Sequence, residues 1–175
     1  MGTDLMLAMS MAMGCGGTPM DQQVPIIRDR NYVQKVDTLG IEGIVPAPAA
    51  RVWEVVPAVL ADLGLKINFL EPETKRIGSC YQKIRVRLGN ESLSTFVDCG
   101  DSRGLPNADR YEVALTVLVT VTPTSATTTK IYTFLLGVGL DGSGTASARL
   151  WCFSRGALED RIRAALEDRI RREPR

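Results

Sequence analysis

Cysteine thiols are the side chains of this chain with the clearest capacity for covalent chemistry, because its 175 residues include no histidine. Without histidine the chain lacks the usual general base, the commonest metal ligand and the ordinary Ser-His or Cys-His nucleophile. Cys99 ends one expected strand and Cys152 nearly ends another, so their side chains can meet at one edge of a sheet. A disulfide between them would stabilise the fold by roughly 3–5 kcal/mol in an oxidising compartment. Cys80 is expected to be buried as a small apolar residue.

Two glycine-containing segments match known motifs but lack the structural context that those motifs require. Gly100 to Gly104 matches G-x-S-x-G, the nucleophile elbow of α/β hydrolases, which needs a following helix and a histidine that takes the serine proton. Gly137 to Gly142 matches G-x-G-x-x-G, but a strand rather than a helix is expected to follow it. We therefore expect a polar surface loop at the first segment and a turn at the second, Asp141-Gly142 being a favourable turn pair.

Lys83, Arg85 and Arg87 lie on one face of an expected strand and form a candidate anion contact, for lipid headgroups or an acidic partner. The competing interpretation, which we favour, is a solvated face that also discourages edge pairing. No aromatic residue interleaves with these charges, which argues against a single-strand nucleic-acid platform. The 21 Lys and Arg also nearly balance the 20 Asp and Glu, so no global field favours nucleic acid.

Acidic residues suggest neither a metal site nor acid–base catalysis. Asp98, Asp101 and Asp109 flank a glycine-containing loop, but their spacing matches no calcium loop, and aspartates are common in turns. The chain has no paired C-x-x-C motif, so a structural zinc site is not expected either. No carboxylate pair stands out from ordinary surface charge. We predict no cofactor, no metal and no catalytic residue, and hence a protein that is not an enzyme.

The first 15 residues predict a lipoprotein signal segment that ends at Cys15. An apolar stretch from Leu5 to Met13 is too short to span a bilayer and has about the length of the apolar region of a signal peptide. The segment Ala12-Met13-Gly14-Cys15 resembles a bacterial lipobox, in which the cysteine is lipidated and becomes the mature N-terminus. Residues 16–38 have the composition of a flexible linker, and residues 39–175 are expected to form a single domain. The alternative is a Met-rich start of a cytoplasmic protein.

The domain is predicted to be α+β. Ile41 to Val45 predicts a strand, and Pro48 begins a helix whose apolar stripe runs to Leu63, with Gly64 as its cap and a kink at Pro57. From Leu65 onward the apolar period becomes two. It predicts strands at 84–88, 93–99, 111–122, 128–138 and 145–153, joined by short connections that favour antiparallel pairing. A helix over 158–170 closes the chain within the duplicated segments ALEDRIR at 157–163 and 165–171, and its last turn is expected to fray.

This order of elements predicts a helix-grip-like fold, in which a mainly antiparallel curved sheet packs on one long helix and a C-terminal helix follows. With the turn at Leu63-Gly64-Leu65, the order over residues 41–171 resembles the helix-grip domains of BamC-type outer-membrane lipoproteins. The resemblance implies a scaffold role in the bacterial envelope and transfers no catalytic residue. Trp53 and Trp151 are candidate binding-surface residues, since exposed tryptophans are enriched at hot spots, although burial is the expected fate of both.

The sequence thus predicts a non-enzymatic lipoprotein of the bacterial cell envelope that faces the periplasm. Its membrane contact would be the lipid anchor, its partners other envelope proteins, and nucleic acid would not be among them. The alternative is a soluble cytoplasmic module that binds a small hydrophobic ligand between the sheet and the helix.

Overall fold

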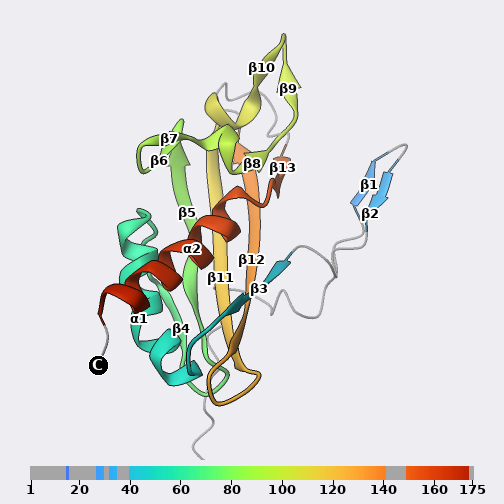
Figure 1. The fold of residues 1–175 in the computed structure, drawn as a ribbon. Helices are drawn as coiled ribbons and strands as arrows, with labels where there is room; N and C mark the ends of the chain where they lie inside the picture. The colour runs from blue at the N-terminus through green and yellow to red at the C-terminus, as the bar shows by residue number, and fades with distance from the viewer. Residues whose placement is uncertain (1–14, 16–26, 30–31, 35–39, 141–148, 174–175) are drawn as a thin grey trace, which may run out of the picture.

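The computed structural model describes residue 15 and residues 27–29, 32–34, 40–140 and 149–173. The architecture is α+β, with a large antiparallel sheet and two helices packed on one of its faces, and the fold class predicted from the sequence is confirmed at this level (Figure 1). The predicted signal segment lies outside the described residues except for Cys15, as does most of the predicted linker.

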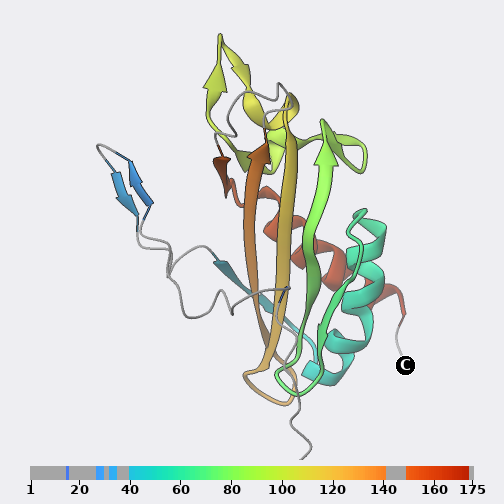
Figure 2. The ribbon, with the colours of Figure 1, turned by 180° about the vertical axis from the view of Figure 1, so that it is seen from behind.

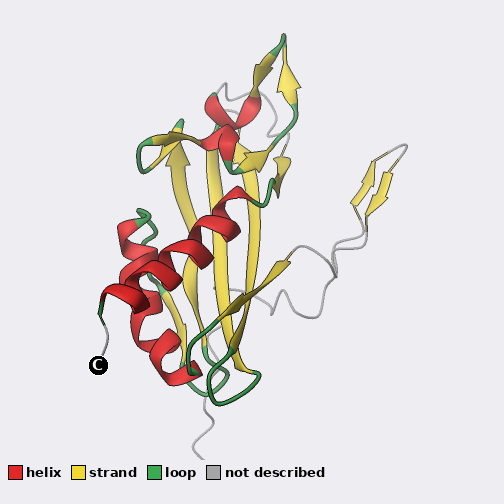
Figure 3. Ribbon diagram, in the orientation of Figure 1, coloured by secondary structure: helices red, strands yellow, loops and turns green. Residues whose placement is uncertain are grey.

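The strands differ greatly in length, and the longest two form the centre of the sheet (Figure 3). The described strands are β1 (Ile27–Asp29), β2 (Tyr32–Gln34), β3 (Gly40–Val45), β4 (Phe69–Glu71), β5 (Arg76–Arg85), β6 (Arg87–Leu88), β7 (Glu91–Ser92), β8 (Val97–Asp98), β9 (Asp101–Ser102), β10 (Leu105–Pro106), β11 (Glu112–Pro123), β12 (Thr129–Leu140) and β13 (Arg149–Ser154).

Seven of these strands make one sheet in the order β4-β5-β11-β12-β13-β8. The seventh, β3, pairs with the first half of β12, whereas β13 pairs with its second half, so both lie along the same side of β12. Strands β1 with β2, β6 with β7, and β9 with β10 form separate two-stranded sheets. Each pairing among these strands is antiparallel, as the short connections predict.

Helix α1 (Ala49–Asp62) ends where the sequence predicts. Gly64 has a positive φ of 82°, a backbone conformation that glycine adopts without a steric cost. The amide of Gly64 bonds the carbonyl of Ala61, and the amide of Leu65 bonds that of Leu60, which is the Schellman arrangement of a helix end. The helix also continues through Pro57. The apolar stripe therefore outweighs the hydrogen bond that proline removes.

Helix α2 (Ala157–Arg172) contains both copies of the duplicated segment. Eight residues make about 2.2 turns, so equivalent residues of the two copies lie only about 80° apart around the helix. Leu158 and Leu166, which are equivalent, are accordingly both fully buried. The duplication lengthens a single apolar stripe, and the helix extends two residues beyond the predicted end at residue 170.

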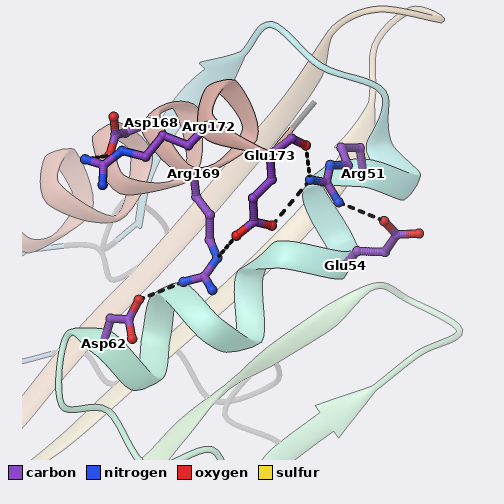
Figure 4. A network of polar contacts seen from close by, with 7 residues as sticks. All are labelled: Arg51, Glu54, Asp62, Asp168, Arg169, Arg172 and Glu173. Atoms are coloured by element: carbon purple, nitrogen blue, oxygen red, sulfur yellow. Dashed lines mark hydrogen bonds and ion pairs between the residues drawn. The ribbon is translucent and has the colours of Figure 1, made fainter. Parts of the chain in front are cut away.

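A network of ion pairs holds the end of α2 against α1 (Figure 4). Arg169 bonds Asp62 at 2.8 Å and Glu173 at 3.4 Å, and Glu173 in turn accepts from Arg51. Arg51 also contacts Glu54 within α1. Exposed pairs of this kind contribute less than about 1 kcal/mol each, so the network orients the last turn more than it stabilises the fold.

Both helices share one apolar core with the facing side of the sheet. From α1 the core takes Val52, Val56 and Leu60, and from α2 it takes Leu158 and Ile162. Strands β11 and β12 contribute their inward residues, which are Val113, Leu115, Val117, Val119, Val121, Ile131 and Leu135.

Three predicted strands differ from the structure. The strand expected at 84–88 is interrupted at Val86, which has a positive φ and is exposed, so that β5 ends at Arg85 and β6 pairs with β7 in a separate sheet. Residues 93–99 were expected to form one strand, but Leu93–Thr95 form a 3-10 turn and β8 has only two residues. Leu93 and Phe96 are both buried, and their spacing of three matches the period of that turn. The strand expected over 145–153 is described as β13 from Arg149, and residues 141–148 lie outside the described part of the chain.

Candidate interaction surface

The face of the sheet opposite to the helices carries a second set of apolar side chains. Along β12, Ile131 and Leu135 belong to the core shared with the helices, so the alternate residues Tyr132, Phe134 and Leu136 point to the opposite face. Leu136 is buried, yet it is not part of that core. The two faces of β12 therefore serve different apolar layers.

Four aromatic side chains lie on this opposite face, which Figure 2 shows from the front, and we call them the outer aromatic patch: Tyr132 and Phe134 of β12, with Trp151 and Phe153 of β13. Phe153 pairs directly with Leu136, and Trp151 pairs with Val138. The rings of Phe153 and Trp151 therefore lie beside outward-facing residues of β12. All four aromatic side chains are half-buried, and none belongs to the main core.

Most of the described aromatic side chains lie outside the main core. The chain has four phenylalanines, four tyrosines and two tryptophans, but among the described residues Phe96 is the one aromatic side chain of the main core; Phe69 of β4 is also buried, outside that core. Trp53 packs partly against the core from α1, with Lys75 lying 5.1 Å over its ring. Large aromatic groups dominate the energetics of cores and interfaces, so their concentration on a helix-free face points to an interface.

Cys80 lies on the same outward face, at a bulge in β5. Alternation from the core residue Ile77 directs Cys80 outward, and the pairing of β5 with β11 shifts register between Leu115 and Val117. The side-chain amide of Asn68 accepts from the backbone N–H of Cys80 at 2.6 Å and donates to its C=O at 2.9 Å. Asn68 thus replaces a neighbouring strand and fixes the backbone at this cysteine.

The sulfur of Cys80 is bonded to Cys15, with the two Cα atoms 5.6 Å apart. Cys80 is 8% exposed, as expected, but it is paired rather than an odd thiol. This bond brings the predicted lipidation site onto the outer face of the sheet. A sulfur in a disulfide cannot also carry the thioether of a lipid anchor, so the two fates of Cys15 exclude each other.

The disulfide predicted between Cys99 and Cys152 is present. Strand β8 pairs with β13 so that Asp98 faces Phe153, and the next position in this register sets Cys99 opposite Cys152. Both sulfurs are buried in the main core. The bond joins the short edge strand β8 to β13, which would otherwise be connected by only two residue pairs.

The candidate anion contact is largely neutralised within the chain. Lys83 and Arg85 both bond the carboxylate of Glu112, at 3.1 and 3.2 Å, and their hydrogen bonds hold the pKa of Glu112 below its usual value. Arg87 donates to the backbone carbonyl of Asn90. Lys83 and Arg85 lie on the part of β5 beyond its pairing with β4, consistent with cations that protect a free strand edge, whereas Arg87 lies in β6.

Two of the three aspartates near the glycine-containing loop, Asp98 and Asp109, have structural partners, and Asp101 is exposed in β9. Asp98 accepts from the amide of Gly100 and pairs with Arg155. Asp109 accepts from the amide and hydroxyl of Ser94; burial opposes ionisation, but these hydrogen bonds leave its pKa below the usual value. Among the described residues no group of three or more acidic or cysteine side chains is arranged to hold a metal ion.

The first glycine segment forms a hairpin, the described part of the second lies in strand β12, and the turn expected at Asp141-Gly142 lies outside the described residues. Gly100 to Gly104 lies in and around the β9–β10 hairpin, with Ser102 in β9. Gly137 lies in β12, where a Cβ atom would come within 2.9 Å of side-chain atoms of both Cys152 and Val113. Close packing around the disulfide accounts for this glycine, and Asp141 and Gly142 of its motif lie outside the described residues.

Glu159 is a buried carboxylate that the sequence did not single out. It lies in the first turn of α2 and is 3% exposed; one carboxylate oxygen accepts from the hydroxyl of Ser154, while the other is buried without a hydrogen-bond partner. Burial raises the pKa of Glu159. No second titratable group faces it closely enough to form an acid–base pair in the described structure, so we assign it no catalytic role.

Sequence reasoning missed the outer aromatic patch, although a signal for it exists. Residues 131–138 are apolar at nearly every position, whereas β11 alternates with Thr116, Thr120 and Thr122. A strand that is apolar on both sides needs a second layer on its outer face. Trp151, which was expected to be buried in the core, belongs to this outer layer.

The chain gives no match to protein-family models, to curated proteins or to solved structures. No helix in the described part of the chain is both long and apolar enough to cross a bilayer.

Proposed function

We propose that this protein is a non-enzymatic module of the bacterial envelope that binds another protein through its outer aromatic patch. The observation that carries the proposal is the placement of Tyr132, Phe134, Trp151 and Phe153 on the helix-free face, outside the main core. Aromatic side chains bury large areas with few rotatable bonds and are enriched among interface hot spots.

Local charge favours a protein partner over an anionic surface. Lys83 and Arg85 already share Glu112, and Lys130, at the opposite end of the outer face, pairs with Glu42 at 2.8 Å. Cations that are paired within the chain give little net attraction to phosphate headgroups or nucleic acid. Because the cations near the outer aromatic patch are already paired within the chain, an apolar surface of another protein is the best partner for the patch.

Location in the envelope is supported by the cysteines. The buried Cys99–Cys152 disulfide is a bond of oxidising compartments. The lipobox-like segment ending at Cys15 adds an anchor, and in the anchored form Cys80 would be a free thiol. The strand, helix, strands, helix order fits a helix-grip variant, and this supports the likeness to BamC-type scaffold domains.

The rival function, a module that binds a small hydrophobic ligand, has less support. Its ligand would lie between the helices and the sheet, where Val56, Leu60, Ile162 and the inward strand residues form one continuous cluster. A ligand there would have to displace close-packed side chains.

Site-specific photo-crosslinking in the native host tests the proposal. A photoreactive amino acid at Phe134 is expected to give one discrete protein adduct, whereas the same group at Leu70, an exposed apolar residue of β4, gives none. With the identified partner purified, Trp151→Ala or Phe153→Ala should weaken binding by about 30-fold or more, the effect of losing a hot spot.

A stability measurement controls for unfolding of these variants. Because both side chains are half-buried and lie outside the main core, each variant should lose less stability than a core truncation would cause, and binding is measured at a temperature at which both variants are folded. Binding that is unchanged in both variants, or equal adducts at Phe134 and Leu70, would rule out the outer aromatic patch as the interface.

A further inference from the structure

The β9–β10 hairpin extends past the end of the main sheet, away from both helices (Figure 1). Ser102 pairs with Leu105, so Arg103 and Gly104 form a two-residue turn. Both turn residues have positive φ, 56° and 74°, as a type I′ turn requires. Arginine is a poor choice for the first of these positions, where Asn, Asp or Gly is usual. A side chain kept at a conformational cost at an exposed tip suggests a functional reason.

Several bonds make the base of the hairpin rigid. The Cys99–Cys152 disulfide lies directly before it, and the amide of Gly100 is bonded to the Asp98 carboxylate at 2.8 Å. Behind it, the buried Asn107 donates its backbone N–H to Gly100 and its side-chain amide to Cys99. The chain on both sides of the hairpin is therefore fastened to the body.

One further bond reaches up the hairpin toward its tip. The guanidinium of Arg110 donates to the carbonyl of Ser102, at 3.3 Å. A hairpin held in this way loses little conformational entropy when it meets a partner, which is the condition for efficient binding by a small contact.

The tip presents one large apolar group and one charge. Leu105 is 56% exposed, among the most exposed large apolar side chains described. Arg103 is exposed and forms no ion pair with any described residue. Within the described part of the chain, Leu105 thus lies outside the core and Arg103 outside every ion pair, although the backbone that carries them is firmly held.

We propose that the β9–β10 hairpin is a second binding element, which inserts Leu105 into an apolar pocket of a partner protein and places Arg103 against a carboxylate at the rim of that pocket. A protein pocket fits better than a bilayer, because a single leucine and a single cation give only marginal membrane affinity. The proposal is independent of the outer aromatic patch, which lies on a face of the sheet rather than at its end.

Photo-crosslinking at Leu105 in the full-length protein tests this, with Thr127 as the matched control. Thr127 is also an exposed hairpin residue, but it lies in the turn between β11 and β12, at the opposite end of the sheet. We expect a discrete protein adduct from position 105 and none from position 127. Arg103→Glu in the same protein should reduce the adduct by about tenfold, the effect of a reversed charge at a contact.

A second measurement separates loss of contact from loss of the hairpin. Arg103→Asn removes the charge but suits the turn, so it should keep the unfolding temperature while still reducing the adduct. Replacing the carboxylate of the identified partner by an amide should reproduce the effect of Arg103→Glu in the purified pair. The proposal is overturned by no adduct at 105, by equal adducts at 105 and 127, by adducts to phospholipid alone, or by an adduct that both arginine variants leave intact.

Discussion

Replacing Glu159 by glutamine is predicted to stabilise the protein at neutral pH. The carboxylate of Glu159 is buried in the first turn of α2, and one of its oxygens has no hydrogen-bond partner. Burial raises its pKa, so the folded protein prefers the protonated acid more strongly than the unfolded chain does. At pH 7, above the pKa of this group in the unfolded chain, burying Glu159 therefore costs free energy.

The sign of the pH dependence follows from the raised pKa. The stability that Glu159 contributes is complete below the pKa of the unfolded chain, 4.5, and is lost as the pH rises through the higher pKa of the folded protein. Glutamine mimics the protonated acid and still accepts from Ser154. The gain from Glu159→Gln should therefore be about 1–3 kcal/mol at pH 7, because the substitution removes the desolvation cost of a buried charge, and should vanish near pH 4.

Urea unfolding of both proteins at the two pH values measures this difference. Glu167 provides the control, because it is the equivalent residue of the second duplicated segment but bonds Arg163 at 3.0 Å. Glu167→Gln should lower stability at pH 7, by no more than about 0.5 kcal/mol. If Glu159→Gln destabilises the protein at pH 7, or stabilises it equally at both pH values, the assignment of an unpaired buried charge is wrong.

Three further variants test other parts of the fold by the same unfolding assay. Val86 has a φ of 64°, so Val86→Gly should raise stability by about 1 kcal/mol, whereas Gly89→Ala, at a φ of 61°, should lower it by a similar amount. Arg169→Ala should cost less than about 1 kcal/mol through loss of its ion pairs, and Arg171→Ala, at an exposed position, should have no measurable effect. Cys152→Ala should cost about 4 kcal/mol, because its disulfide closes a loop with a sequence separation of 53 residues. Reductant should lower the stability of the unmodified protein more than that of this variant, because the variant has already lost the Cys99–Cys152 bond.

The elements with strong periodicity could be predicted from the sequence. The apolar stripe of α1 and the cap at Gly64 define a helix without knowledge of its neighbours. Strict alternation likewise defines β11, and the duplicated segment defines α2. In each case one face of the element is buried in the shared core, so the apolar residues recur with the period of the helix or strand and reveal the element in the sequence.

Segments with irregular backbone could not be predicted in this way. Residues 93–99 alternate in polarity, which predicts a strand. The structure instead buries Leu93 and Phe96, three residues apart, by a 3-10 turn, and the alternating pattern hides this spacing of three. The bulge in β5 places Tyr81 at a positive φ of 52° and interrupts the pattern between Cys80 and Ile84. Such features depend on the partner strand rather than on local propensity.

The cysteine pairs illustrate the same division. Cys99 directly follows β8 and Cys152 lies in β13, and the alternation around both cysteines was enough to predict that they lie near strand ends, although not that β8 pairs with β13. Cys15 and Cys80 are 65 residues apart, and the first lies in a segment without periodicity. Nothing local in the sequence indicates this bond. The outer aromatic patch could be predicted in part. The apolar residues on both sides of β12 indicate that something covers its outer face, but they do not indicate what covers it.

The intact mass of the protein from its native host, alkylated without prior reduction, tests most directly whether this is an exported, anchored protein. The account predicts a chain that begins at Cys15 and carries acyl groups, with one alkylated thiol at Cys80 and the loss of two hydrogens for the Cys99–Cys152 bond. An uncleaved chain, whether its four cysteines are alkylated or paired, would contradict the anchor. If all four cysteines were alkylated, the envelope location would be contradicted as well.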